Sequence, residues 1–183
     1  MANKNVLFTV LFILLSALAC QLPMSKSQAL KENYLQLRNI WFTTRPEDLG
    51  IVALPGSTQP FAIIMDMGID RETVTIASSF AGDGSMYTST GGAVIGGIDH
   101  ENVRKASVHF VEMAAEFVDK MTLVTEYPLP AEGHVKFYVI TPNGVYTAEE
   151  ARADALISGS HTLSPLFIAG NDVITQIRIT SGQ

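Results

Sequence analysis

Apolar residues recur at helical spacing near the start of the chain. Four of them follow one another at intervals of four, three and four residues: Leu30, Tyr34, Leu37 and Trp41. This spacing places them along one side of a helix. Pro46 disfavours helical geometry in the residue before it. The pattern therefore predicts a helix that ends near Thr43.

A second and longer helix is predicted for Glu101–Met121. Apolar residues step by three or four positions along this segment, and charged residues take the opposite side. Such a helix buries its apolar side against a sheet. Asp99 precedes the segment, so we expect its carboxylate to cap the helix by accepting hydrogen bonds from the first amides.

Between these helices, three segments rich in β-formers follow one another closely. They are Phe61–Met67, Thr73–Phe80 and Ser85–Thr90, and the short connections predict an antiparallel meander. The second segment alternates apolar and hydroxyl residues, which predicts one buried face and one wetter face. The wetter face would carry Thr73, Thr75 and Ser79.

The C-terminal third predicts a hairpin and two helices. Val135–Ile140 and Gly144–Thr147 read as paired strands. Thr147 and Glu150 have the spacing of a capping box for a short helix that would end at Gly159. The last segment fits a strand or a helix, and a cap and first turn at Ser164-Pro165 favour the helix.

These elements predict an α+β domain, in which helices pack on an antiparallel sheet of about five strands. The element content resembles profilin-like and roadblock-like folds. A likeness at the level of the fold carries no function by itself.

The first residues predict export. After Lys4, the segment from Val6 to Ala19 is apolar apart from Thr9 and Ser16, which is the length of a signal peptide and short for a membrane span. We therefore divide the chain into a signal peptide, 1–19, and a single domain, 20–183. A buried N-terminal helix and an uncleaved anchor are the alternatives.

The residues around Cys20 fit two forms of N-terminal processing. Ala17 and Ala19 fit ordinary signal peptidase, whereas a cysteine after the apolar run resembles the lipobox of bacterial lipoproteins, although Ala17 and Leu18 depart from the usual lipobox residues. That resemblance implies lipidation of Cys20, and Gln21 resembles a signal for outer-membrane delivery. We expect a lipoprotein of the cell envelope, with a soluble periplasmic or secreted form as the alternative.

The net charge argues against one class of partner, and the cysteine content argues against an internal disulfide. The net charge is −6, and it becomes −7 without Lys4. Such a surface repels phosphate backbones, so no nucleic-acid partner is expected. Cys20 is the only cysteine, so the fold depends on its apolar core rather than on a disulfide.

The stretch 82–97 holds six of the 14 glycines and precedes the long helix. As a phosphate cradle it lacks the lysine and spacing of a P-loop, and Asp99 and Glu101 would repel an anion at the helix start. We read it as a hairpin turn, a strand and its exit. A binding loop at this exit would use four residues: Tyr87, Ser89, Gly91 and Gly92.

A serine-type hydrolase is the alternative function. It would use Ser85 or Ser89 with His161 or His100, and Asp83 or Asp66 as the acid. No nucleophile-elbow pattern surrounds these serines. The four histidines are scattered, so we expect no metal and no other cofactor. Asp66 and Asp70 flank Gly68, where we expect a tight turn in which the carboxylates cap amides.

Several short segments resemble a group of small uncharacterised bacterial proteins. The residues that carry this resemblance are Ser85–Gly92, Gly96 and Gly97, Phe137 and Tyr138, Gly144 and Val145, Leu163–Phe167, and Val173–Gln176. The resemblance covers most of the chain after the leader and implies one domain, with no assigned activity. We expect an envelope protein that binds a protein, a small ligand or a second copy of itself, rather than an enzyme.

Overall fold

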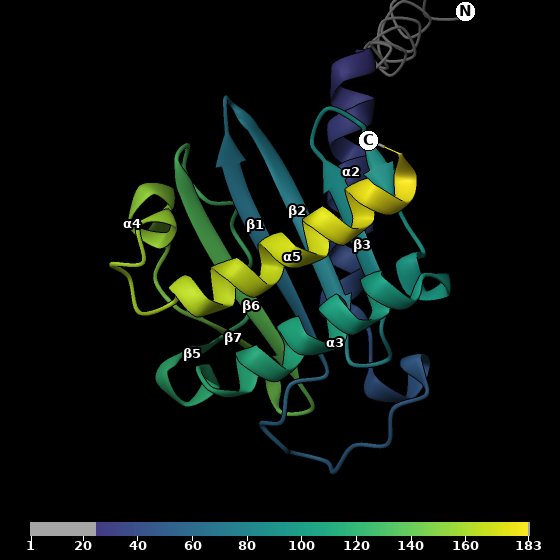
Figure 1. Cartoon of the computed structure of the whole chain (residues 1–183), viewed down its shortest axis with the longest axis vertical. Coiled ribbons are helices and arrows are strands. Elements are labelled where there is room, and N and C mark those ends of the chain that lie inside the picture. The colour runs from purple at the N-terminus through teal and green to yellow at the C-terminus, as the bar shows by residue number, and fades with distance from the viewer. Residues whose placement is uncertain (1–24, 183) are drawn as a thin grey trace, which may run out of the picture.

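The computed structural model describes residues 25–182, and in these residues one antiparallel sheet separates two layers of helices (Figure 1). The order of strands is β4-β3-β2-β1-β6-β7-β5, and β8 pairs with β6 beyond the end of β7. The α+β prediction is confirmed, although the sheet has eight strands rather than about five.

The long strands are the predicted ones. They are β1 (Ala62–Ile69), β2 (Glu72–Ser79), β3 (Gly84–Thr88), β6 (His134–Thr141) and β7 (Gly144–Thr147). The three others are β4 (Ala93–Val94), β5 (Thr122–Val124) and β8 (Ala151–Arg152). Strands of two or three residues are too short to show alternation, which explains why the sequence does not reveal them.

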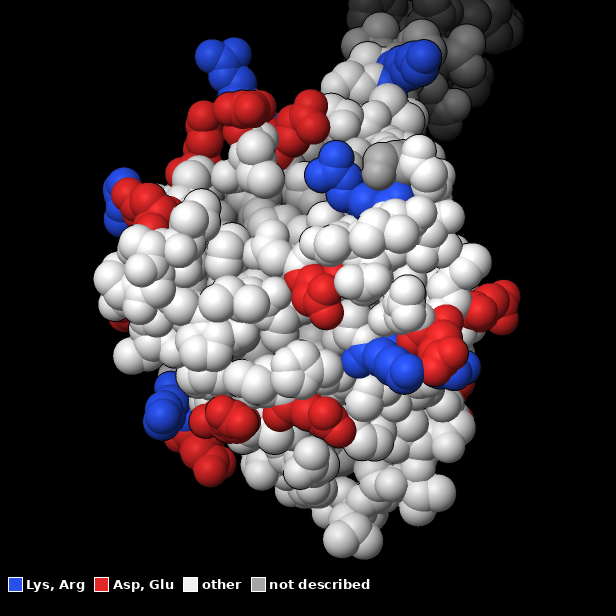
Figure 2. All heavy atoms as spheres, viewed as in Figure 1, with Lys and Arg blue, Asp and Glu red and all other residues white. Residues whose placement is uncertain are grey.

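Two helices cover the first face of the sheet. They are α3 (Glu101–Ala115) and α5 (Ser164–Ser181), which lie side by side across the strands (Figure 1). The core beneath them includes Ile76, Phe110 and Val173, all fully buried. On the outer surface of this layer, acidic and basic side chains are interspersed, while the surface over α5 is largely uncharged (Figure 2).

The second face is covered by α2 (Lys26–Thr43), which ends at the predicted residue. Ser25 and Gln28 form a capping box at its start. Tyr34 and Trp41, from the predicted apolar side, pack against Tyr87 and Tyr138 of the sheet. Because α2 covers this face, the prediction of a wetter face on β2 is wrong: Thr75 and Ser79 are fully buried.

The turn between β1 and β2 lies two residues later than predicted. Gly68 belongs to β1, and the turn is made by Asp70 and Arg71, which have φ of 46° and 66°. Asp66 is therefore in the middle of a strand rather than beside a turn. It is completely buried, so the prediction that it caps a tight turn is wrong.

The caps of the later helices also differ from the predictions. The residue before α3 is His100, because Asp99 belongs to a short 3-10 helix, η2 (Gly97–Asp99), so Asp99 does not cap α3. The Thr147 hydroxyl donates to the carbonyls of Phe137 and Ala148 instead of capping α4 (Ala153–Ile157). Gly159 follows α4 with a φ of 75°, as a helix terminator should.

The end of α3 and the start of α5 also bear on the predictions. The long helix ends at Ala115, and the 3-10 helix η3 (Val118–Lys120) continues toward Met121. The last segment is a helix, as predicted, with Pro165 in its first turn. Ser164 is already inside α5, so its hydroxyl is not the cap.

Candidate functional site

A buried ion pair fastens α2 to the centre of the sheet. The Arg38 side chain donates from Nε and Nη2 to Oδ2 of Asp66, at 2.9 and 2.6 Å. Arg38 is 2% exposed and Asp66 is fully buried. Burial, the largest cause, raises the pKa of Asp66, and the hydrogen bonds and charge of Arg38 oppose that shift.

Two hydroxyl groups extend this pair into a network. Thr75 donates to Oδ1 of Asp66, and the Tyr34 hydroxyl lies 2.7 Å from that of Thr75. Burial, and then the Asp66 carboxylate, raise the pKa of Tyr34 to about 12. The network joins α2, β1 and β2 through groups that are removed from water.

Aromatic rings enclose the guanidinium of Arg38. Its Cζ lies 4.9 Å from the ring centroid of Phe42 and 5.3 Å from that of Tyr138. Phe42 stacks on Tyr127 with 3.9 Å between centroids. These contacts are typical of a cation held by aromatic faces. Because both charges are paired and covered, we interpret the Arg38–Asp66 network as structural rather than as a ligand site.

A groove beside this network is open to solvent. It lies between the C-terminal half of α2 and strand β3, has a volume of about 290 Å³, and we call it the α2 groove. Its lining is mainly apolar: Leu37, Ile40, Trp41, Leu49, Ile95 and Gly96, with Thr44, Asp83, Ser85 and Tyr87 as the polar members. Ile40 and Ile95 at its rim are 57% and 60% exposed.

The polar groups of the α2 groove are held in place. Trp41 donates from Nε1 to the Tyr87 hydroxyl at 3.0 Å, which fixes both rings. Ser79 donates its hydroxyl to Oδ2 of Asp83 at 2.9 Å, and the Asp83 amide donates back to the Ser79 hydroxyl. A mainly apolar cavity with a few oriented polar groups has the character of a small-molecule site.

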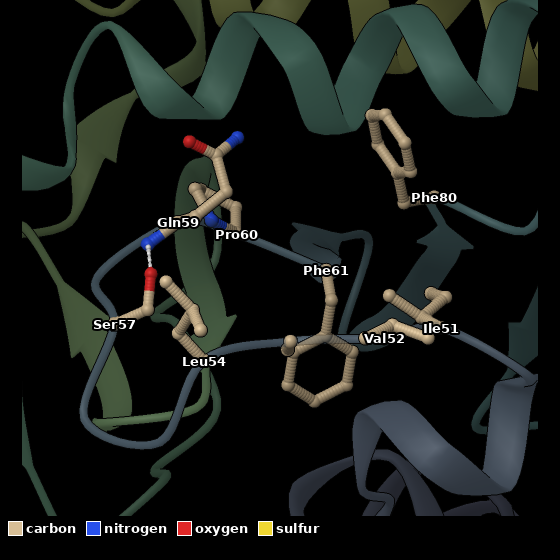
Figure 3. A pocket seen from close by; sticks show the side chains of 9 residues that line it. Ile51, Val52, Leu54, Ser57, Gln59, Pro60, Phe61 and Phe80 are labelled. Atoms are coloured by element: carbon tan, nitrogen blue, oxygen red, sulfur yellow. Dashed lines mark hydrogen bonds between the residues drawn. The ribbon is translucent and has the colours of Figure 1, made fainter.

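A second cavity lies in the loop before β1 (Figure 3). This loop pocket has a volume of about 270 Å³, and the side chains that line it include Ile51, Leu54, Phe61 and Phe80. The backbone amide of Gln59 donates to the Ser57 hydroxyl at 3.1 Å and stabilises the loop. None of the residues that line the loop pocket is charged, so it offers less means of orienting a ligand than the α2 groove.

The structure does not bring the residues of the hydrolase alternative together. Ser85 alternates with Gly84 and Met86 on β3, so its side chain faces α2, where it lines the α2 groove. His161 precedes α5 on the other side of the sheet, where its Nδ1 accepts from the Leu163 amide. The sheet therefore lies between the proposed nucleophile and base.

The other candidate residues, Ser89 and His100, lie apart from the α2 groove lining. The Ser89 hydroxyl accepts from the Thr73 amide and continues the pairing of β2 and β3. His100 lines a cavity of about 100 Å³ at the ends of α3 and α5, and Ser85 is not among the residues that line it. Among residues 25–182, no three His, Cys, Asp or Glu side chains are placed to hold a metal ion.

The predicted binding loop is only partly assembled. Tyr87 lines the α2 groove, but Ser89, Gly91 and Gly92 do not. Gly91 lies against the side chain of Leu30, and the Gly92 amide donates to the Thr88 hydroxyl. The strand exit is thus a tight turn beside α2, while α2 and β3 supply several of the residues that line the α2 groove.

Several residues of the site were not predicted. Arg38 lies between Tyr34 and Trp41 at helical spacing, so a charge on the apolar side of a helix was the available signal. Asp66 within the apolar run of β1 was the matching signal, because a carboxylate in a buried strand needs a partner. Ile40 and Ile95 carried no such signal.

Comparison with family models, with curated proteins and with solved structures found no match. The resemblance to uncharacterised bacterial proteins therefore stays a prediction. Cys20 and the predicted signal peptide lie outside the described residues. In the part of the chain that the structure describes, no helix combines the length and apolar character needed to cross a membrane.

Proposed function

We propose that the protein is exported, is anchored to the cell envelope through lipid on Cys20, and acts there as a binding module without catalysis. The α2 groove is the proposed binding site. Its apolar lining with oriented polar groups at Asp83 and Tyr87 is the observation that carries the proposal. The apolar run before Cys20 supports the export step.

The ligand of this groove is a small and largely apolar molecule. A volume of about 290 Å³ lies just below the usual range for small-molecule sites, so the ligand is small. The exposed Ile40 and Ile95 would cover the ligand and lose their contact with water when it binds. Trp41 and Tyr87 already satisfy one another by a hydrogen bond, so the groove can close over apolar atoms without leaving the indole amine unpaired.

Titration with hexan-1-ol, followed by amide chemical shifts in NMR, tests this proposal. We expect saturable shifts around the groove that Ile40→Glu abolishes, because a carboxylate would then stand at the apolar rim. Ile168→Glu is the matched control, since Ile168 is 65% exposed on α5, across the sheet. No saturable binding, or equal binding by both variants, would contradict the proposal.

A further inference from the structure

We infer that the α2 groove selects an organic cation, a small amine or quaternary ammonium attached to an apolar body. This inference rests on the proposed function and specifies the ligand class of the same groove. The inference depends on Asp83, because this is the only charged residue among those that line the groove.

The Asp83 carboxylate is rigidly presented. Its Oδ2 accepts from the Ser79 hydroxyl, its amide donates to that same hydroxyl, and its carbonyl accepts from the Ser79 amide. Three hydrogen bonds to one fully buried residue fix the turn between β2 and β3. No hydrogen bond to Oδ1 is found among the described residues, so this oxygen can accept from a ligand.

No cation of the described chain forms an ion pair with Asp83. The four ion pairs found in residues 25–182 involve Arg38, Arg45, Lys105 and Arg152, and none of them includes Asp83. The Arg104 stem lies against Gly82 on the opposite, α3 side of the turn. A half-buried carboxylate beside apolar walls attracts a cation more strongly than one in bulk water does.

The rings beside Asp83 add to this preference. Trp41 and Tyr87 line the same groove, and aromatic rings attract cations through their quadrupole. Their mutual hydrogen bond keeps them in place without involving Asp83. An anionic ligand would meet a carboxylate of like charge here, and a neutral ligand would leave that carboxylate partly desolvated without a cation to pair with.

Calorimetry with three probes of equal chain length tests the inference: hexyltrimethylammonium, hexan-1-ol and hexanoate. We expect the cation to bind about tenfold more tightly than the alcohol, a difference of about 1.4 kcal/mol. Hexanoate should bind most weakly. Asp83→Asn should lower the affinity for the cation about tenfold and remove its preference over hexan-1-ol, since the amide oxygen still accepts from Ser79 but carries no charge.

The matched control is Asp172→Asn, which removes the same charge from the exposed surface of α5 and should change neither affinity. Salt provides a measurement on the unaltered protein, because binding of the cation should weaken as ionic strength rises while binding of the alcohol should not. Equal affinities for cation and alcohol, or a cation affinity that Asp83→Asn and salt leave unchanged, would overturn the inference while the proposed function stands. Failure of all three probes to bind would overturn both.

Discussion

Arg38 and Asp66 are two charges that folding removes from water, which makes each of them dependent on the other. A buried pair of this kind contributes little net stability compared with apolar residues, but loss of one partner leaves an uncompensated charge. Asp66 has a second donor in Thr75, whereas within residues 25–182 the Arg38 side chain donates hydrogen bonds to Asp66 alone and lies against the surrounding rings. The pair therefore specifies where α2 sits more than it stabilises the domain.

Arg38→Met should lower the free energy of unfolding by about 3–5 kcal/mol, because the Asp66 carboxylate would stay buried without its partner. Urea unfolding followed by circular dichroism measures this change. Arg152→Met is the control, since it breaks the ion pair of Arg152 with Asp154, in which both side chains are about two-thirds exposed. Equal urea midpoints for the two variants would show that the buried pair does not fasten α2.

The raised pKa of Tyr34 predicts that the domain loses stability at alkaline pH. Its folded pKa of about 12 exceeds the ordinary value of 10.0, so the folded state holds its proton between these values while the unfolded state releases it. Stability therefore falls as pH rises from 10 to 12, by up to about 2–3 kcal/mol. Unfolding at several pH values should show a shallower decline in Tyr34→Phe than in the unaltered protein. Parallel declines would contradict this role for Tyr34.

Single residues also mark the limit of what the sequence predicts. The apolar side of α2 was readable from Tyr34 and Trp41, because periodicity is a local property. The partner of Arg38 was not readable, because Asp66 is 28 residues away and only the tertiary fold brings the two together. The α2 groove was missed for the same reason, although Tyr87, Ser85 and Asp83 were among the candidate residues.

At the scale of elements, β1 is the most deeply buried of the long strands, since seven of its eight residues are buried. It lies between β2 and β6, and helices cover both of its faces. Gly68 near its end passes close to the backbone before β6, where an added Cβ would lie 2.3 Å from the Ala131 carbonyl oxygen. A close approach of two backbones, rather than a turn, is therefore the reason for this glycine.

Gly68→Ala should destabilise the domain by about 1–3 kcal/mol, because the Ala131 backbone must move to admit the methyl group. Thermal unfolding measures the effect. Gly92→Ala is the control, since its Cβ would meet only the Thr88 side chain, at 3.0 Å. If both variants melted at the same temperature, the segment around Ala131 would be free to shift.

The elements themselves were largely predictable, and their boundaries less so. The meander, the second hairpin and the three longest helices follow from periodicity and turn residues. The burial of the second face of β2 could not be predicted in this way. Thr73, Thr75 and Ser79 have the composition of a solvated face, and only the tertiary structure places α2 over them. Hydroxyl residues suit both environments when hydrogen-bond partners are present, as Tyr34 and Asp66 are for Thr75.

For the whole molecule, the proposed anchor predicts its location in the cell. Lipid on Cys20 should add the mass of a diacylglycerol group to the mature N-terminus and place the protein in the membrane fraction. Cys20→Ser should remove the modification and release the protein from that fraction. Mass spectrometry of the native N-terminus checks this prediction, and cleavage after Ala19 without lipid, or an intact leader, would contradict it.

Self-association is a separate prediction for the whole chain. A homodimer is one of the expected assemblies, and light scattering after size-exclusion chromatography would measure it directly. A mass of 19.8 kDa for the full chain, less the leader where that is removed, is the value for a monomer. Only monomer at all concentrations would leave a different protein or a small ligand as the partner.

The groove lies near the C-terminal end of α2, and this position determines where the ligand would come from. A helix rises about 1.5 Å per residue, so Leu37, the first groove residue on α2, lies roughly 16 Å along the axis from Lys26, at the end that follows Cys20. In a lipid-anchored molecule, α2 would act as a spacer that holds the groove away from the bilayer surface. The ligand would then be collected from the surrounding aqueous phase, at a concentration set by its solubility there, rather than drawn sideways out of the membrane.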